Sequence, residues 1–300
     1  MKPTISIITA SYNQGQFIER TIESVLSQDV DGLEYIVMDG GSSDQTLDIL
    51  KRYNGRLTYT SQPDKGQADA INKGIQATSG DIIGWLNSDD VYYPGALAAV
   101  QDYFAAHPQV QVLYGDGRHI DSDDNVIEPY YTEDWNFERL AEVCYLCQPA
   151  VFLRRELFEQ YGLLNIDLNF CMDYEFWLRV GRDIPFVRLR QVLAGSRLHD
   201  ETKTLGQRVT FHREIIQMTK KRLGRPPVRW VFNYAHAVID NWGWQRETAA
   251  GRVKYISFLI LLSSLAFLRW QYYIPRQART TMWEWLTQPL YHSLREAFGR

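Results

Sequence analysis

The stretch Ile82-Ile-Gly-Trp-Leu-Asn-Ser-Asp-Asp90 decides the fold, because five residues without a charged side chain are followed at once by an amide, a hydroxyl and two carboxylates. An unbroken apolar run of this length predicts a strand buried on both faces, as in parallel sheets. Two adjacent carboxylates repel each other unless a positive group lies beside them, and Mg²⁺ or Mn²⁺ would serve. Alternatively, Ser88, Asp89 and Asp90 cap a helix near Pro94, and this stretch alone leaves both interpretations open.

Three similar strands are predicted upstream, at Ile5–Thr9, Glu34–Asp39 and Leu57–Ser61, and residues at helical spacing separate each strand from the next. Strands that alternate with helices predict an α/β fold with a doubly wound, mostly parallel sheet flanked by helices. Each strand ends in a polar cluster. Because ligands of such sheets bind beyond the carboxyl ends of the strands, these clusters form the candidate site.

The rest of the chain is less regular. We expect an acidic loop over residues 115–125, a helix over Asp173–Val180, and further strands at Val110–Tyr114, Gln148–Leu153 and Phe186–Leu189. The run Arg225-Pro226-Pro227 indicates a boundary between a domain of residues 1–224 and a helical C-terminal region of residues 225–300.

Charge is distributed unevenly along the 300 residues, although the formal net charge is only −4. Residues 1–200 carry 16 Lys and Arg against 30 Asp and Glu, a charge of −14, whereas residues 201–300 carry 16 against 6, a charge of +10. Six of the nine Trp also fall in residues 201–300. An acidic body argues against general binding of nucleic acid, and a basic, Trp-rich region suits a membrane surface.

The apolar run Tyr255–Leu268 has 14 uncharged residues, fewer than the roughly 20 that a membrane span needs. Lys254 and Arg269 flank it, and aromatic residues follow, which is typical of a helix that lies at a membrane interface. The alternative is a core helix that packs on the catalytic domain. We expect a peripheral membrane contact through residues 253–285.

The three cysteines, Cys144, Cys147 and Cys171, are too few and odd in number for a disulfide framework, so we expect reduced thiols. The N-terminus shows no long apolar segment of a signal peptide. The expected location is therefore cytoplasmic, with a peripheral position at the inner face of the membrane.

Several clusters could carry chemistry, and each also has an ordinary structural explanation. The turn Asp39-Gly-Gly-Ser-Ser-Asp44 suits polar or anionic ligand groups but is equally a capped strand–helix turn, and it is no dinucleotide fingerprint. Asp173 could be a general base or an acidic residue in a first helical turn. His199 could be a ligand or a hydrogen-bonded structural histidine, and Lys65 could be a solvated turn lysine.

Taken in order, these segments resemble glycosyltransferase family 2, whose members are inverting, nucleotide-sugar-dependent enzymes with the GT-A fold. The resemblance covers about the first two thirds of the chain. It rests on Ile5-Ser-Ile-Ile-Thr-Ala-Ser-Tyr-Asn13, Val37-Met-Asp-Gly-Gly-Ser-Ser-Asp44, Pro63-Asp-Lys-Gly66, Asp69-Ala-Ile-Asn-Lys-Gly74, Gly84-Trp-Leu-Asn-Ser-Asp-Asp90 and Asp173-Tyr-Glu-Phe-Trp-Leu-Arg179.

The resemblance implies a role for each matching residue. Asp173 would be the catalytic base, and Asp89, Asp90 and His199 would hold Mg²⁺ or Mn²⁺. Asp39 would face the base or ribose. The other residues expected to bind the nucleotide sugar are Thr9, Ser11, Tyr12, Lys65, Asp69, Asn87 and Asp90. The donor expected is a UDP-sugar, and the acceptor is a glycan or a lipid-linked sugar of cell-surface polysaccharide biosynthesis.

This sequence departs from the family pattern at three positions. Asn87 replaces the first carboxylate of the metal-binding motif, Gly40 replaces the usual second Asp after the second strand, and Met172 replaces the Glu that commonly precedes the base. Two other functions are considered. A nucleotidyltransferase would need a cationic loop after the first strand, where Ser11–Gly15 has no cation, and a non-catalytic sugar-nucleotide-binding protein would fit Asn87 and Gly40.

Overall fold

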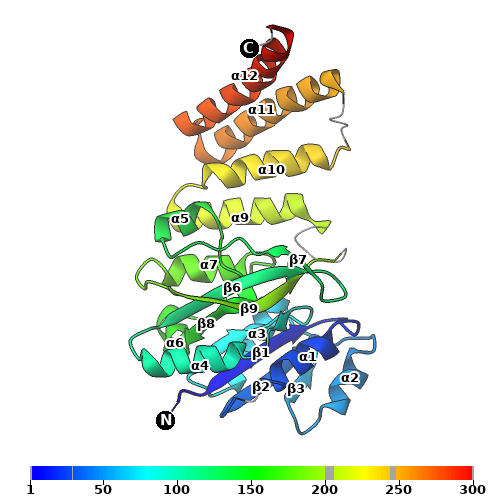
Figure 1. The fold of residues 1–300 in the computed structure, drawn as a ribbon, viewed down its shortest axis with the longest axis vertical. Helices are drawn as coiled ribbons and strands as arrows, with labels where there is room; N and C mark the ends of the chain where they lie inside the picture. The colour runs from blue at the N-terminus through cyan, green and yellow to red at the C-terminus, as the bar shows by residue number, and fades with distance from the viewer. Residues whose placement is uncertain (1, 29, 200–205, 244–247, 299–300) are drawn as a thin grey trace. The chain divides into compact units, whose positions relative to one another are not determined.

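The computed structural model describes residues 2–28, 30–199, 206–243 and 248–298, with the backbone alone for residues 249, 250 and 288–298. The chain forms two compact units (Figure 1). The first comprises Met1–Leu140 and Cys144–Thr202, and the second comprises Ala141–Val143 and Lys203–Arg300. Each unit is described by itself.

A nine-stranded sheet organises the described part of the first unit. Its order is β3-β2-β1-β4-β8-β6-β9-β5, with β7 paired to β6. The β3-β2-β1-β4 section is parallel throughout, as predicted, and antiparallel pairing begins where β8 joins β4. The strands are β1 (Ile5–Ser11), β2 (Leu33–Asp39), β3 (Thr58–Ser61), β4 (Ile82–Trp85), β5 (Val91–Tyr92), β6 (Val112–Ile120), β7 (Val126–Pro129), β8 (Val151–Arg154) and β9 (Val187–Arg197).

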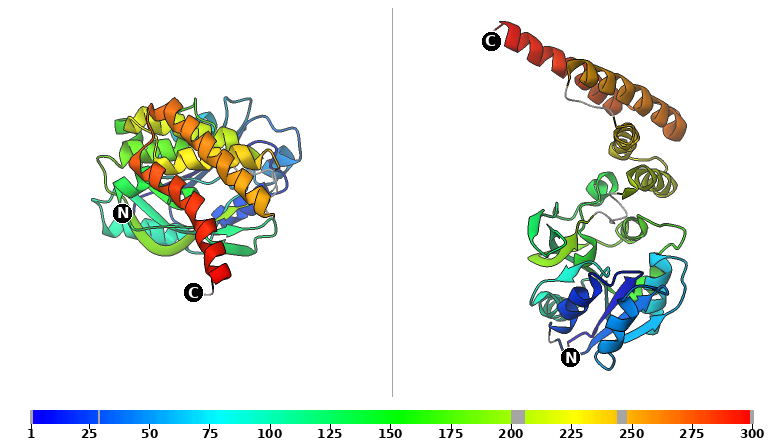
Figure 2. Two further views of the ribbon diagram at one scale, coloured as in Figure 1. Left: turned by 90° about the horizontal axis from the view of Figure 1, so that it is seen from above. Right: turned by 90° about the vertical axis from the view of Figure 1, so that its right-hand side faces the viewer.

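Helices cover both faces of this sheet (Figure 2). Alternate side chains of a strand point to opposite faces, so an apolar strand such as β1 must be covered on both. Ile5 and Ile7 belong to the buried cluster that includes side chains of α1, α2 and α4. Ile8 points the other way, against α3, where a Cβ on Gly74 would lie 2.4 Å from Ile8 Cγ2. The helices are α1 (Ile18–Leu26), α2 (Thr46–Arg52), α3 (Gln67–Ala77), α4 (Ala96–Ala106), α6 (Glu156–Tyr161) and α7 (Met172–Val180), and α5 (Phe137–Glu142) runs from the first unit into the second.

The central strands are longer than the sequence predicted. β6 continues through Ile120, into the segment expected to be an acidic loop, because β9 pairs with it in parallel as far as Arg197. Gly115 permits this pairing, since a Cβ there would lie 2.4 Å from Leu193 Cδ1. The expected strand Gln148–Leu153 is wrong in its first half, where Pro149 lies in a 3₁₀ turn (Gln148–Ala150) before β8 begins.

The second unit is helical in its described residues, as expected of the C-terminal region. It contains α9 (Arg208–Leu223), α10 (Val228–Asp240), α11 (Ala249–Gln271) and α12 (Arg276–Phe298). The predicted boundary at residues 224 and 225 falls within this unit, where Gly224 adopts a φ of 79° after α9. The assignment of residues 225–300 as a separate functional region stays a prediction.

Buried His212 of α9 makes the stability of the second unit sensitive to pH. It lies beside Phe211 and Trp230, with ring centroids 5.0 and 5.9 Å away. Burial, and then the charge of Arg208, lower the pKa of His212 to about 4. Between pH 4 and 6.5 the His212 side chain therefore binds a proton more readily in the unfolded chain than in the folded one. The stability that neutral, buried His212 contributes is complete above pH 6.5 and is lost as pH falls toward 4.

We expect acidification from pH 7 to 5 to destabilise the native protein by about 1–2 kcal/mol more than a His212→Phe variant, after discounting for partial solvent screening. Denaturant unfolding followed by Trp fluorescence at both pH values measures this difference. Identical pH dependence in the two proteins would show that His212 does not titrate as its burial requires.

Candidate active site

The ends of the parallel strands bring the expected nucleotide-binding residues to one edge of the sheet. Ser11 of β1 pairs with Asp39 of β2, which in turn pairs with Ser61 of β3. The Gly40 amide donates to the Ser11 carbonyl at 2.8 Å. At the end of β4, the Asn87 Oδ1 accepts a hydrogen bond from Gln67 Nε2 at 2.5 Å, which joins this strand end to the start of α3.

The carboxylate of Asp39 holds the glycine turn that follows it. Asp39 is buried, and its Oδ2 accepts hydrogen bonds from the Gly41 and Ser42 amides and from Ser61 Oγ. The Ser42 hydroxyl, which donates to Asp39 Oδ1, also accepts from the Asn13 amide. Asp39 thus shapes the loops at this edge, and its contact with a base or ribose stays a prediction.

The three residues expected at the end of β1 differ in their surroundings. Thr9 is fully buried, with its hydroxyl 3.2 Å from Tyr35 Oη. Ser11 is also buried, and its hydroxyl has no hydrogen-bond partner among the residues that the structure describes. Tyr12 is 63% exposed and lies beside Gly40, where a Cβ would be 3.4 Å from Tyr12 Cδ2. The Tyr12 ring is therefore available to a ligand, whereas the Ser11 hydroxyl is enclosed by the surrounding chain.

The loop before α3 is closed by Asp69. Its Oδ2 accepts the Lys65 amide at 3.0 Å and pairs with Lys73 Nζ at 2.8 Å, and these contacts, that with Lys73 above all, lower the pKa of Asp69. The Lys65 side chain is exposed. Asp69 therefore fixes the backbone of the loop that presents Lys65.

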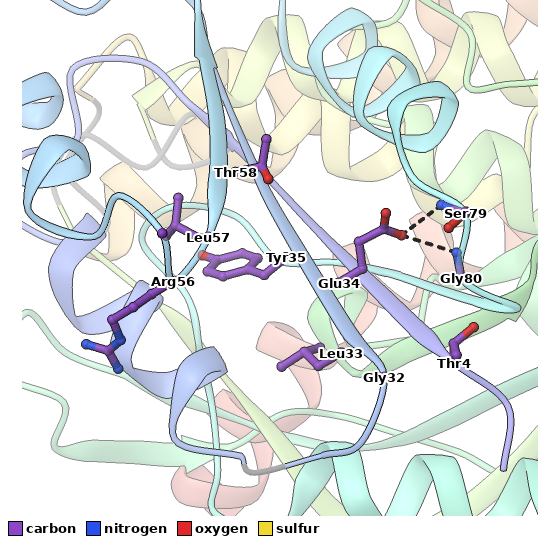
Figure 3. A pocket seen from close by; sticks show the side chains of 11 residues that line it. Thr4, Gly32, Leu33, Glu34, Tyr35, Arg56, Leu57, Thr58, Ser79 and Gly80 are labelled. Atoms are coloured by element: carbon purple, nitrogen blue, oxygen red, sulfur yellow. Dashed lines mark hydrogen bonds between the residues drawn. The ribbon is translucent and has the colours of Figure 1, made fainter.

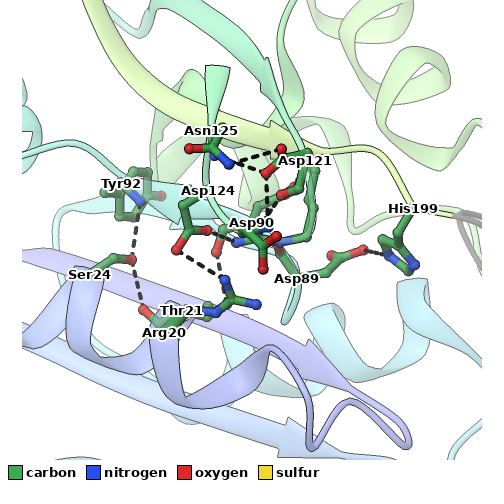
Figure 4. Close-up of polar contacts among 12 residues, drawn as sticks. Arg20, Thr21, Ser24, Asp89, Asp90, Tyr92, Asp121, Asp124, Asn125 and His199 are labelled. Atoms are coloured by element: carbon green, nitrogen blue, oxygen red, sulfur yellow. Dashed lines mark hydrogen bonds and ion pairs between the residues drawn. The ribbon is translucent and has the colours of Figure 1, made fainter. Parts of the chain in front are cut away.

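The two adjacent carboxylates after β4 have different environments. Asp90 is buried, and its two oxygens accept hydrogen bonds from the Arg197 amide at 2.8 Å and from Asn87 Nδ2 at 3.0 Å. Burial, and then the neighbouring charge of Asp89, raise the pKa of Asp90 well above its usual range. Asp89 is half-buried, and its Oδ2 lies 3.1 Å from His199 Nε2 (Figure 4).

The side chain of Arg197 fixes the turn that carries both carboxylates. Its Nε donates to the Asp89 carbonyl and its Nη1 to the Asp121 carbonyl, both at 2.6 Å, and its Nη2 pairs with Asp124. Asp124 also binds the more exposed Arg20, at 3.1 Å (Figure 4). From the other side, the Thr21 hydroxyl donates to the carbonyls of Ser88 and Asp90.

The structure brings together two of the three expected metal ligands. No group of three or more His, Cys, Asp and Glu residues gathers around a possible metal position in the described ranges. The Asp89 carboxylate and the His199 imidazole do face each other. Both oxygens of Asp90, in contrast, accept hydrogen bonds from the chain, from the Arg197 amide and from Asn87 Nδ2. A carboxylate with one further protein ligand fits a Mg²⁺ or Mn²⁺ ion whose other positions are filled by diphosphate oxygens.

Asp173 is a half-buried residue in the first turn of α7, and its Oδ1 accepts a hydrogen bond from the Tyr174 amide at 2.7 Å. The other acidic residue of this helix, Glu175, is buried and paired with Arg179 at 2.7 Å. Asp173 is thus less buried than Glu175, and its role as a general base stays a prediction. Burial, and then the charge of Asp173, raise the pKa of the free thiol of Cys144, so that this cysteine is not a ready nucleophile.

An open hollow of about 490 Å³ lies at the amino ends of β1, β2 and β3, away from the candidate residues at their carboxyl ends (Figure 3). Thr4, Glu34 and Thr58 line it, and Glu34 accepts hydrogen bonds from the amides of Ser79 and Gly80. None of the expected site residues lines this hollow. We therefore place the candidate site at the carboxyl ends of β1, β2 and β4.

Comparison with known proteins identifies the family of this chain. The sequence profile described as Glycosyl transferase family 2 matches residues 6–162, about half of the chain. This chain belongs to glycosyltransferase family 2. The chain is 29% identical to the chondroitin synthase of Escherichia coli over 229 residues, which are 74% of this chain and 33% of that protein. It is 33% identical to an uncharacterised glycosyltransferase of Mycobacterium tuberculosis over 64% of this chain and 74% of that one. The chain thus spans about a third of the chondroitin synthase.

Solved structures show that the chain has a GT-A-like fold. Staphylococcus aureus TarS, in a complex with UDP-GlcNAc, has a TM-score of 0.61 at 15% identity, over 87% of this chain and 81% of that one. The mannosyltransferase PcManGT of Pyrobaculum calidifontis, in a complex with GDP-Man and Mn²⁺, has a TM-score of 0.59 at 17% identity, over 99% and 83%. The expected family and fold class are confirmed.

Two residues of the candidate site, Arg197 and Gln67, are not among those predicted from the sequence. A signal for Arg197 lay in its position two residues before His199, because β9 ends at Arg197 beside the turn that carries the two carboxylates. For Gln67, which binds Asn87 across 20 positions, the sequence alone carried no signal.

We expect Arg197→Lys to destabilise the protein by about 2–4 kcal/mol, because a lysine cannot replace the forked donors and leaves buried acceptors unpaired. Arg20→Lys is the matched control: it alters a more exposed partner of the same Asp124 carboxylate and should cost less than about 1 kcal/mol. Denaturant unfolding of both variants decides the matter, and equal losses would contradict the role of Arg197.

Proposed function

We propose that this protein is an inverting glycosyltransferase that moves a sugar from a nucleoside-diphosphate donor to a hydroxyl group of a glycan or lipid-linked acceptor. The observation that carries the proposal is the combination of the facing Asp89 and His199 side chains with the half-buried carboxylate of Asp173, in a chain of this family. A nucleotidyltransferase gains no comparable support, since the loop after β1 has no cation.

Asp173 acts as the general base. Its carboxylate accepts the proton of the acceptor hydroxyl as that oxygen attacks the anomeric carbon from the face opposite the diphosphate. The new bond forms while the bond to the diphosphate oxygen breaks, so that one displacement inverts the anomeric centre. The Tyr174 amide holds one carboxylate oxygen, which orients the base. A positioned base is worth about 10²–10⁴-fold in rate.

The donor site lies at the carboxyl edge of β1, β2 and β4. The exposed Tyr12 ring can contact the nucleoside, and the exposed Lys65 side chain can approach the diphosphate. A UDP-sugar is the preferred donor, which the UDP-GlcNAc complex of TarS supports, although the GDP-Man complex of PcManGT shows that the fold also accepts guanosine donors. We place the reaction in polysaccharide synthesis at the cytoplasmic face of a membrane.

Asp89 and His199 would hold the divalent cation, with Mg²⁺ or Mn²⁺ as the candidates. When bound there, the cation supplies positive charge to the leaving diphosphate. Asp90 contributes through its hydrogen bonds with Asn87 and the Arg197 amide, which keep the Asp89 carboxylate directed toward His199. The replacement of a carboxylate by Asn87 is thus accommodated, because the amide can donate to Asp90.

The first test is a panel of UDP- and GDP-sugars, with membrane extract as the source of acceptor. We expect transfer from at least one donor, and a loss of about 10²-fold or more in Asp173→Asn with nucleotide binding retained. Asp102→Asn, on the exposed surface of α4, is the matched control and should keep full activity. If the native protein binds a donor without transferring its sugar, a non-catalytic binding protein is favoured instead. If Asp173→Asn transfers sugar at the native rate, Asp173 is not the general base.

The second test removes the metal. A chelator should abolish transfer and added Mn²⁺ or Mg²⁺ should restore it, because the diphosphate would otherwise leave from an acidic site. In His199→Gln, the Mn²⁺ concentration for half-maximal binding, measured by calorimetry with a nucleoside diphosphate present, should rise about 10-fold or more. Full activity in chelator would exclude the cation.

A further inference from the structure

The helix α11 has one apolar face packed inside the second unit. Tyr255 and Leu259 of this helix form a buried cluster with Ala235 and Ile239 of α10. The Tyr255 hydroxyl also lies 2.7 Å from His236 Nδ1 and donates to Asp240 Oδ1 at 3.2 Å. This face is therefore an internal interface that includes polar groups.

The opposite face of α11 is also apolar, and it is exposed. Its residues recur every three or four positions, which places them in one stripe along the helix. Leu261, Leu265 and Leu268 are 52%, 54% and 49% exposed. Exposed Lys254 and Phe258 precede them on the stripe, and Tyr272, which is 80% exposed, ends it. A soluble surface rarely exposes a contiguous stripe of this kind without a partner.

The helix α12 presents a second exposed stripe, made of Arg276, Arg279, Trp283 and Leu286 at the same spacing. Trp283 is 66% exposed. The two stripes thus combine leucine side chains with Trp, Tyr, Arg and Lys, the residues found where a bilayer meets water. Residues 201–300 carry a formal charge of +10.

The charge and the internal packing identify the occupant of this surface. A second copy of the chain would bring like charges together, whereas an anionic bilayer attracts each basic residue by about 1 kcal/mol. Residues Gly251–Gln271 of α11 are long and apolar enough to cross a membrane, as a core helix can also be. A crossing would immerse the contacts of Tyr255 with His236 and Asp240 in hydrocarbon, so the helix lies along the surface instead.

We propose that the exposed stripes of α11 and α12 dock this protein on an anionic bilayer, with α11 parallel to the membrane and its leucines inserted below the headgroups. Exposed Lys254 and Arg269 contact lipid phosphates near the two ends of the leucine stripe. Docking needs no reaction at the donor site, so its failure would remove the proposed membrane location but leave the proposed sugar transfer untouched.

The test is flotation of the full-length protein with vesicles. We expect binding to phosphatidylcholine vesicles that contain about 30% phosphatidylglycerol, and little binding to phosphatidylcholine alone. Leu261→Glu combined with Leu265→Glu should weaken binding about tenfold or more, since two apolar side chains no longer enter the bilayer. The matched control is Val126→Glu with Ile127→Glu, which changes two exposed apolar residues of β7 in the first unit and should bind normally.

Near-ultraviolet circular dichroism confirms that each variant is folded. Equal binding by the α11 variant and the native protein, or no vesicle binding by the native protein, would overturn the proposal. It would also be overturned if the native protein were a dimer that the α11 variant converts to a monomer without any vesicle binding. Resistance of the membrane-bound native protein to alkaline carbonate would show a spanning helix and overturn the parallel orientation.

Discussion

The candidate site depends on the hydrogen bonds and the ion pair that the buried guanidinium of Arg197 makes. A charge removed from water is tolerated only when its donors are satisfied, and here they bind acceptors from the segments after β4 and after β6. The centroid of the Phe17 ring, just before α1, lies 5.0 Å from the guanidinium carbon. Because one planar group fixes segments that are far apart in the sequence, the positions of Asp89 and His199 are coupled to the packing of the whole sheet.

This arrangement gives two neighbouring carboxylates different tasks. Asp90 is buried and occupied by internal donors, and its raised pKa reflects the cost of a second negative charge beside Asp89. Asp89 keeps its carboxylate directed to His199. A pair of acidic residues that reads in the sequence as one metal motif thus divides into a carboxylate that faces His199 and a carboxylate held by internal hydrogen bonds. The asymmetry arises from burial, which no spacing rule reports.

The sequence predicted the parallel section of the sheet because β1, β2 and β4 carry their own signal, an apolar run that stops at polar residues. The lengths of β6 and β9 could not be predicted in the same way. Gly115 has a low strand propensity, yet its missing side chain is what lets Leu193 pack beside β6. The hydrogen bond between Gln67 and Asn87 likewise depends on tertiary packing. Local patterns therefore predicted the candidate residues, and long-range pairing determined how these residues are held.

The division of charge along the chain follows from separate physical requirements. In the first unit, acidic residues such as Asp89 and Asp173 are suited to hold a cation and to accept a proton, so an excess of negative charge accompanies the chemistry. In the second unit, exposed leucines would be a liability in water unless a surface covers them. Basic residues beside them, such as Arg276 and Arg279, favour an anionic surface over self-association. A protein with the same leucines and an acidic second unit would lose that selectivity, because its charge would repel the bilayer.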